Sequence, residues 1–180
     1  MIKLLILFIA VLSYPINSKV YPTIDNLHLL HTLKQSYELD YYPLTCSDNV
    51  MALGKRLVAV GINPLQLTVV FLKHKHAPHV SISAKAQRLN FREHTYLPSP
   101  WVFHAVLIFN NIVLDQDYTN HPQLITLDHY LERMWGQQQL ENITFQVKPF
   151  TEYKASDFGG RFNQDRYPEI NLEDFLAIFL

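Results

Sequence analysis

Three side chains that together could perform nucleophilic catalysis follow one another along the chain, Cys46, His104 and Asp115. In such a set a cysteine thiolate attacks a carbonyl carbon, an imidazole carries the proton, and a carboxylate fixes the tautomer of the imidazole. The chain contains nine histidines, so this order alone arises easily by chance. Whether the Cys–His–Asp order indicates a catalytic site therefore depends on the helices and strands that carry the three residues.

Cys46 is the only cysteine, and it lies where an extended segment meets a helix. The residues after it show apolar side chains at helical spacing, at Val50, Leu53, Leu57 and Val60. We expect a helix over residues 47–60 that is capped by Thr45 or Ser47 and ended by Gly61. The backbone N–H groups of a helix N-terminus favour a thiolate. The polar residues around Cys46 argue against its burial.

His104 and Asp115 lie on the two strands of an expected β-hairpin. The apolar run 101–109 is followed by Asn110-Asn111, a turn signal because Asn tolerates the positive φ of a type I′ turn. This register places Asp117 opposite His104 and Asp115 diagonal to it, all on one face of the hairpin. Either carboxylate could orient the imidazole, and we expect the helix of Cys46 to pack across this face.

The remaining pattern predicts an α+β domain. Further helices are expected over residues 24–37, 126–135 and 172–179, begun by Asp25 or Asn26, by Thr126 or Asp128, and by Asn171. Further strands are expected over residues 67–72, 80–83 and 144–147, and a polar loop over residues 155–167.

The first eighteen residues have the features of a secretory leader. A positive start at Lys3 precedes an apolar run from Leu4 to Leu12, and Ser18 offers a small residue for cleavage. The run is shorter than the roughly 20 residues that span a membrane. We expect export to the periplasm or medium with cleavage near Ser18, which leaves residues 19–180 as one domain. An uncleaved N-terminal anchor is the alternative.

Composition excludes several classes of protein. Apolar residues form 48% of the chain and aromatic residues 13%, which excludes a disordered chain. The formal charge of −1 provides no basic field for nucleic acid. No segment after the leader is long and apolar enough to span a membrane. A single thiol in an exported protein forms no internal disulfide and is open to oxidation, so its retention calls for a use.

A histidine-rich segment at residues 73–79 is the one candidate metal site in the sequence. Three imidazoles there could bind zinc or copper. The neighbouring Lys73 and Lys75 repel a cation, and no carboxylate or thiolate accompanies the histidines. We interpret the segment as a solvated loop, and the chemistry of the cysteine requires neither a metal nor a cofactor.

The sequences around Cys46, His104 and Asp115 resemble the protein N-terminal glutamine amidohydrolase family. The similar segments are Cys46-Ser47-Asp48-Asn49-Val50, Trp101-Val102-Phe103-His104 and Asp115-Gln116-Asp117-Tyr118. Residues 155–157 and 171–175 are similar to the family's C-terminal Ala-Ser-Asp and Asn-Leu-x-Asp-Phe elements. The resemblance is spread in short blocks over residues 41–179. Residues 158–161 depart from it, since Phe-Gly-Gly-Arg replaces Arg-Ser-His-Met.

The resemblance implies that Cys46 is the nucleophile, His104 the base and Asp115, in preference to Asp117, the orienting carboxylate. The implied fold is papain/transglutaminase-like, with the nucleophile at the start of a helix packed on an antiparallel sheet that carries the histidine and the aspartate. The implied reaction is attack on a glutamine carboxamide, release of ammonia from a thioester, and hydrolysis to glutamate.

Recognition of the substrate calls for further residues around this triad. An oxyanion needs N–H donors, and the backbone of Cys46 at the helix start is a candidate. The α-ammonium of an N-terminal glutamine needs an acidic or carbonyl partner, and the candidates are Asp48, Asp117 and Asp157. Trp101 could form a wall of the substrate pocket, although a buried strand aromatic is at least as common.

We therefore expect an exported glutamine deamidase whose substrate is a peptide or protein with glutamine, preferably at its N-terminus. The same triad would also serve a protein glutaminase that acts on internal glutamines, a cysteine peptidase, or an acyl- or transglutaminyl transferase. The non-enzymatic alternative is an inactive binding domain in which His104 is structural and Cys46 is tolerated.

Overall fold

The part of the chain that the computed structural model describes folds into an antiparallel sheet of five strands with helices on both sides. That part comprises residues 25–41, 45–76, 103–118, 122–136, 140–154 and 166–179. The α+β class predicted from the sequence is confirmed. Within the described residues, no helix has both the length and the apolar character needed to cross a membrane.

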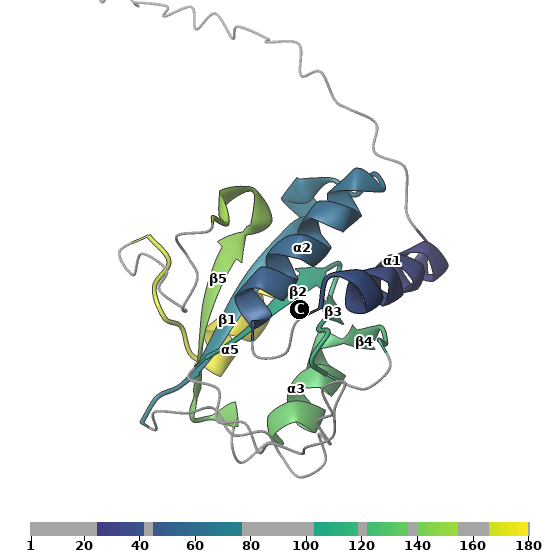
Figure 1. The fold of residues 1–180 in the computed structure, drawn as a ribbon. Helices are drawn as coiled ribbons and strands as arrows, with labels where there is room; N and C mark the ends of the chain where they lie inside the picture. The colour runs from purple at the N-terminus through teal and green to yellow at the C-terminus, as the bar shows by residue number, and fades with distance from the viewer. Residues whose placement is uncertain are drawn as a thin grey trace, which may run out of the picture.

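The described elements follow one another along the chain as shown in Figure 1. The helices are α1 (Asn26–Leu39), α2 (Cys46–Ala59), α3 (Leu127–Trp135) and α5 (Leu172–Phe179). The strands are β1 (Leu67–His74), β2 (His104–Phe109), β3 (Ile112–Leu114), β4 (Ile125–Thr126) and β5 (Ile143–Pro149). Short 3-10 turns occupy Pro64–Gln66 and Phe150–Glu152.

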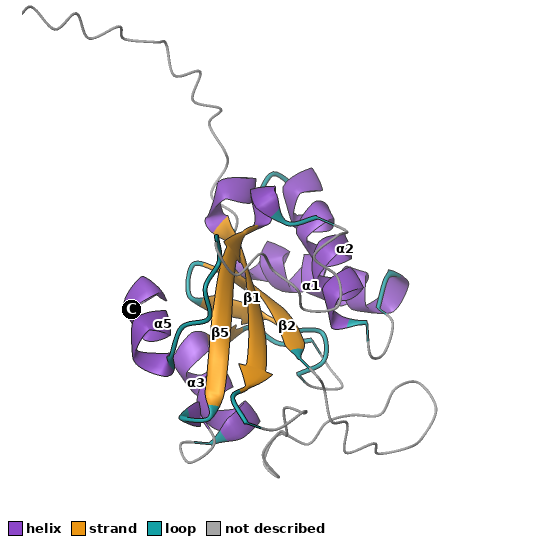
Figure 2. Cartoon of the chain, turned by 90° about the vertical axis from the view of Figure 1, so that its left-hand side faces the viewer, coloured by secondary structure: helices purple, strands orange, loops and turns teal. Residues whose placement is uncertain are grey.

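The strand order is β4-β3-β2-β1-β5, so β2 is central. Figure 2 shows α1 and α2 on one side of the sheet and α3 and α5 on the other. Each face of the sheet has its own apolar core. Alternate residues of β2 explain this division, because Ala105 and Leu107 pack toward α2 whereas Val106 and Ile108 pack toward α3. All six residues of β2 are consequently buried.

The hairpin between β2 and β3 has the predicted turn and register. Asn110 and Asn111 have φ values of 47° and 62°, as a type I′ turn requires, and Phe109 pairs with Ile112. The pairing of the two strands ends at Leu107 and Leu114. The expected continuation to a pair between residues 104 and 117 is therefore wrong, and residues 115–118 form a turn instead.

Helix α2 begins and ends close to the predicted residues. Thr45 is its N-cap residue, and Gly61, with φ of 102°, follows its end. Its buried stripe includes Val50, Leu53 and Leu57, whereas Val60 is 47% exposed. The expected position on the sheet is wrong. The helix covers the face of Ala105 rather than the face that alternation assigns to His104, because the apolar stripe of α2 fits the odd-numbered side chains of β2.

The other predicted elements are largely present. Helix α1 begins after Asp25, whose carboxylate accepts the N–H of His28 at 2.8 Å, and α3 begins after Thr126. Strands β1 and β5 are each longer than predicted, and β4 is not predicted at all because it has only two residues. The leader (residues 1–18), the predicted strand 80–83 and nearly all of the predicted loop 155–167 lie outside the described residues.

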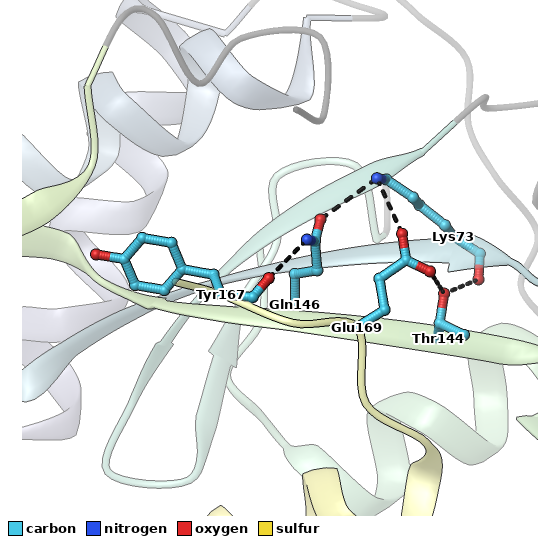
Figure 3. Close-up of polar contacts among 5 residues, drawn as sticks. All are labelled: Lys73, Thr144, Gln146, Tyr167 and Glu169. Carbon is cyan, nitrogen blue, oxygen red and sulfur yellow. Dashed lines mark hydrogen bonds and ion pairs between the residues drawn. The ribbon is translucent and has the colours of Figure 1, made fainter. Parts of the chain in front are cut away.

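Polar side chains at the β1–β5 side of the sheet hold the segment that precedes α5 (Figure 3). Lys73 Nζ lies 3.3 Å from Gln146 Oε1 and 3.4 Å from Glu169 Oε1. Thr144 also donates to Glu169, and the amide of Gln146 donates to the carbonyl oxygen of Tyr167. We call these five residues the Glu169 cluster. Together with a β-bridge between Phe145 and Ile170, they fasten the C-terminal segment to β5.

Candidate active site

Cys46 is the first residue of α2 and is buried, with 5% of its surface exposed. Its expected exposure is therefore wrong. The polar neighbours that suggested exposure are themselves buried in two cases, since Ser47 is 5% and Asn49 is 4% exposed, and only Asp48 of the three faces solvent. The thiol consequently lies at the edge of the apolar core between α2 and the sheet, beside Ala105 and Leu114.

His104 is the first residue of β2, and its side chain is completely buried. Its Nε2 atom lies 2.9 Å from Asp115 Oδ2. Burial disfavours the charged imidazolium, but the negative charge of Asp115, its hydrogen bond and the interaction with Cys46 outweigh burial and raise the pKa of His104 from 6.5 to about 10. The electrostatics therefore link all three residues of the predicted triad, with a protonated histidine in the middle at neutral pH.

Asp115 follows the last residue of β3 and accepts three hydrogen bonds. Besides His104, the hydroxyl of Tyr130 donates to Oδ2 at 2.6 Å, and the backbone N–H of Asp117 donates to Oδ1 at 2.8 Å. Burial alone would raise the pKa of Asp115. The charge of His104 and these hydrogen bonds outweigh burial and hold that pKa below 3.8. Donors from His104, Tyr130 and the backbone of Asp117 thus hold the carboxylate of Asp115 in one orientation.

Asp117 has a different neighbourhood from Asp115, although both are buried. The hydroxyl of Tyr41 donates to Asp117 Oδ1 at 2.5 Å. Between the two aspartates, the amide of Gln116 donates to Ser36 Oγ at 3.0 Å. Ser36 of α1 and Tyr41, two residues after the end of that helix, therefore hold the turn at residues 115–117 from one side, and Tyr130 of α3 holds it from the other. We call His104, Asp115, Asp117, Tyr41 and Tyr130 the Asp115 cluster.

A small cavity of about 10 Å³ adjoins the thiol, which is roughly the volume that one water molecule needs. Polar groups of the 115–117 turn and of α2 line it together with three apolar side chains and Ala105; the lining residues are Cys46, Asn49, Val50, Leu53, Ala105, Leu114, Asp115, Gln116 and Asp117. Asp117 is therefore the one described candidate for ammonium recognition that borders the same space as the thiol.

Asp48 occupies a separate, open groove on the outer side of α2. Tyr153, Lys55 and Arg56 line that groove with it, and the guanidinium of Arg56 forms an ion pair with Asp40. Residues two positions apart on a helix point in nearly opposite directions, so the exposed carboxylate of Asp48 is turned away from Cys46. Trp101 and Asp157, the other two candidate substrate-binding residues, lie outside the described residues.

The first turn of α2 presents donors close to the thiol. Thr45 provides no side-chain capping hydrogen bond to this turn, so its backbone N–H groups keep the donor capacity that a helix N-terminus offers to an anion. Tyr153 Oη donates to the carbonyl oxygen of Ser47 at 3.0 Å, which fixes the turn against the 3-10 segment after β5. The hydroxyl of Ser47 is buried and makes no hydrogen bond with the described part of the chain.

Two groups of residues could be considered as metal ligands. His104, Asp115 and Asp117 each offer one ligand atom, and these atoms lie within 4.8 Å of one another. The donors already bound to both carboxylates favour a hydrogen-bonded cluster over a metal centre there. In the predicted histidine loop, Nδ1 of His74 accepts the N–H of His76 at 3.1 Å, and residue 79 lies outside the described ranges.

Tyrosine hydroxyls are the part of this site that sequence reasoning does not identify. In the sequence, Tyr130 falls within the predicted helix 126–135 at an inward position of its apolar pattern, and Tyr41 falls within the extended segment that precedes Cys46. A buried tyrosine usually has a hydrogen-bond partner, so the inward position of Tyr130 is a usable signal that some buried acceptor lies nearby. Only the tertiary structure shows which group is the acceptor.

Comparison with known proteins adds no family assignment. No protein-family model matches the chain, and no curated protein matches it.

Proposed function

We propose that this protein is a cysteine-dependent amidohydrolase that converts a glutamine side chain to glutamate and releases ammonia. The observation that carries the proposal is the buried pair of His104 and Asp115, 2.9 Å apart and coupled to the thiol at the start of α2. A fully buried ion pair is costly to maintain for stability alone, and perturbed titratable groups of this kind concentrate at catalytic sites.

The arrangement supports a mechanism in two steps. The attacking species is the thiolate of Cys46, and His104, whose pKa is raised to about 10, is the imidazolium that supplies the proton. The sulfur attacks the carboxamide carbon and forms a tetrahedral oxyanion, and the C–N bond then breaks as His104 gives its proton to the leaving nitrogen. Ammonia departs and a thioester remains on Cys46.

The second step regenerates the thiolate. His104, now neutral, takes a proton from water, and the resulting hydroxide attacks the thioester carbonyl. The C–S bond breaks with the electron pair on sulfur, and the product leaves as the carboxylic acid, which gives its proton to solvent and becomes glutamate. The imidazolium then again faces the sulfur of Cys46. In both steps the oxyanion would accept hydrogen bonds from backbone N–H groups of the first turn of α2, and Asp115 would keep the imidazole oriented.

The choice of glutamine, and of an N-terminal position, depends on the local resemblance to the protein N-terminal glutamine amidohydrolases. We infer the papain/transglutaminase-like arrangement from the same source and from the position of Cys46 at the start of a helix packed on the sheet. Asp117 is the favoured partner for the α-ammonium of the substrate, because it borders the cavity beside the thiol. Export, with the leader cleaved near Ser18, remains part of the proposal.

Paired peptides test this proposal. The substrates are a peptide with glutamine at its N-terminus, its N-acetylated form, and a peptide of the same composition with glutamine inside. Release of ammonia together with the mass gain of one deamidation, from the free N-terminal peptide alone, is the expected result. The Cys46→Ala variant is the control for ammonia released without the thiol.

Each alternative gives a different outcome in this experiment. Deamidation of the internal glutamine would indicate a protein glutaminase, and shortened peptides would indicate a cysteine peptidase. Ammonia release that occurs only with an added amine, together with a cross-linked product, would indicate a transferase. A chain that leaves every peptide unchanged and whose Cys46 fails to react with iodoacetamide at neutral pH would be a binding domain, and the proposal would be wrong.

A further inference from the structure

The hydroxyl of Tyr130 lies beside the contact between His104 and the carboxylate of Asp115. It donates to Asp115 Oδ2 at 2.6 Å, and the same oxygen lies 2.9 Å from His104 Nε2. Tyr130 itself is completely buried on α3. Two donors on one carboxylate oxygen restrict the rotation of that carboxylate, and the direction of the imidazole depends on it.

Packing explains the ring of Tyr130 but leaves its hydroxyl unexplained. The ring contacts Tyr118, with centroids 5.4 Å apart, and meets the edge of Trp135 at 5.6 Å. A phenylalanine would fill the same space in this core. The hydroxyl reaches Asp115 from the side of the sheet opposite α2. The two ends of the Cys46–His104–Asp115 series are therefore supported from different layers of the fold.

We propose that Tyr130 is a positioning residue of the active site, whose hydroxyl fixes the oxygen of Asp115 that holds His104. This inference rests on the proposed role of Cys46, His104 and Asp115. It concerns their orientation and does not depend on which amide the protein hydrolyses.

The charged and titratable groups around Asp115 define what a change at Tyr130 would alter. They are His104 from β2, Cys46 from α2, Asp117 and Tyr118 from the turn, Tyr41 from the end of α1, and Tyr130 and Arg133 from α3. Of these, Tyr130 is a neutral donor to Asp115 and acts to lower its pKa. Loss of its hydroxyl therefore raises the pKa of Asp115, and the carboxylate becomes protonated at a higher pH.

The test compares Tyr130→Phe with Tyr118→Phe in the full chain. Both variants remove one buried hydroxyl from neighbouring rings, but the Tyr118 hydroxyl makes no hydrogen bond to Asp115. The first readout is substrate-free, a carbon NMR titration of the Asp115 carboxyl group. The second is the pH dependence of Cys46 alkylation by iodoacetamide, and the third is ammonia release from the N-terminal glutamine peptide.

In Tyr130→Phe we expect the carboxyl titration and the acid limb of Cys46 alkylation to move together to higher pH. We also expect ammonia release to fall about tenfold, which is the usual loss for a partner of a catalytic group. Tyr118→Phe should leave both titrations at the wild-type position. Denaturant midpoints of the two variants provide the control for a general loss of packing.

The outcomes separate this inference from the proposed function. Wild-type titrations in Tyr130→Phe would overturn the positioning role even if the protein releases ammonia. An equal shift in Tyr118→Phe would also overturn it, because a general packing effect would then explain both. Shifted titrations in a protein that acts on no glutamine peptide would support the role of Tyr130 and would contradict deamidation alone.

Discussion

The sheet carries two networks of polar side chains that differ chiefly in burial. In the Glu169 cluster (Figure 3), Lys73 and Glu169 lie 3.4 Å apart with 26% and 35% of their side chains exposed. In the Asp115 cluster, His104 and Asp115 lie 2.9 Å apart with 0% and 3% exposed. Both networks join segments that are distant in sequence, and both contain an acid and a base.

Burial, rather than the number of hydrogen bonds, determines how strongly the charges in each cluster shift the pKa values of their neighbours. Water screens the charges of the Glu169 cluster, so this ion pair is worth little beyond fastening the segment before α5. In the Asp115 cluster the carboxylate is only 3% exposed, so solvent screens it weakly, and its charge raises the pKa of His104 to about 10. Substitutions in the Asp115 cluster should therefore change activity, whereas substitutions in the Glu169 cluster should change only stability, and that slightly.

The largest effect is expected from Cys46→Ala and His104→Ala. Each removes a group that forms or breaks a bond in the proposed reaction, so ammonia release should fall by roughly 10⁴-fold or more. Circular dichroism should show the wild-type helix and strand content for Cys46→Ala. Ammonia release by Cys46→Ala within a few fold of the wild type would place the nucleophile elsewhere.

The two aspartates of the 115–117 turn should differ in the next largest effect. Asp115→Asn removes the charge that holds the imidazolium and should lower ammonia release about 10²–10⁴-fold. Asp117→Asn leaves the His104–Asp115 contact in place and should act on KM more than on kcat, because the proposed role of Asp117 is ammonium recognition. The measurement is steady-state kinetics on the N-terminal glutamine peptide. A larger loss of kcat in Asp117→Asn than in Asp115→Asn would reverse the two roles.

Stability should depend on pH through the Asp115 cluster. His104 titrates at 6.5 in the unfolded chain and at about 10 in the folded protein. Its contribution to folding is therefore complete below pH 6.5 and is lost as the pH rises toward 10. Asp115, whose pKa is lowered, contributes above pH 3.8 and loses that contribution as the pH falls further.

Denaturant unfolding between pH 6.5 and pH 10 measures the histidine part of this dependence. The free energy of unfolding of the wild type should decline over that interval, and the decline should be shallower in Asp115→Asn, which lacks the charge that raises the pKa of His104. Equal slopes in the two proteins would show that this buried pair does not set the pH dependence.

The smallest effect is expected from the Glu169 cluster. Glu169→Gln removes the charge that faces Lys73 but keeps a group that Thr144 can hydrogen-bond. The free energy of unfolding should change by less than about 1 kcal/mol, and the change should shrink further in high salt. Ammonia release should equal that of the wild type. A loss of activity comparable with that of Asp115→Asn would contradict the expectation that only the Asp115 cluster affects activity.

Local patterns in the sequence predict the elements that carry the site. The spacing of Val50, Leu53 and Leu57 predicts α2 and thereby the position of Cys46 at its start. Asn110-Asn111 predicts the hairpin turn, which fixes the register of β2 and β3 to the residue. Both are short-range features, because helix periodicity and turn chemistry depend on residues that are neighbours along the chain.

The partners within the site depend on contacts that local patterns do not contain. Extension of the hairpin register predicts Asp117 opposite His104, but β3 ends at Leu114 and the following turn brings Asp115 to the imidazole instead. The polar residues around Cys46 predict exposure, but Cys46 is buried together with Ser47 and Asn49 in the packed fold. Tyr41, two residues after the end of α1, and Tyr130 of α3 reach the 115–117 turn from segments that precede and follow it, so only the packed fold identifies them.

The most direct test of the account is the fate of an N-terminal glutamine peptide in water enriched in ¹⁸O. We expect the wild type to release one ammonia per peptide and to place one ¹⁸O atom in the new side-chain carboxylate, and we expect Cys46→Ala to do neither. An unchanged peptide, a cleaved backbone, or equal conversion by Cys46→Ala would contradict the claim that the buried pair of His104 and Asp115 serves Cys46 in glutamine deamidation.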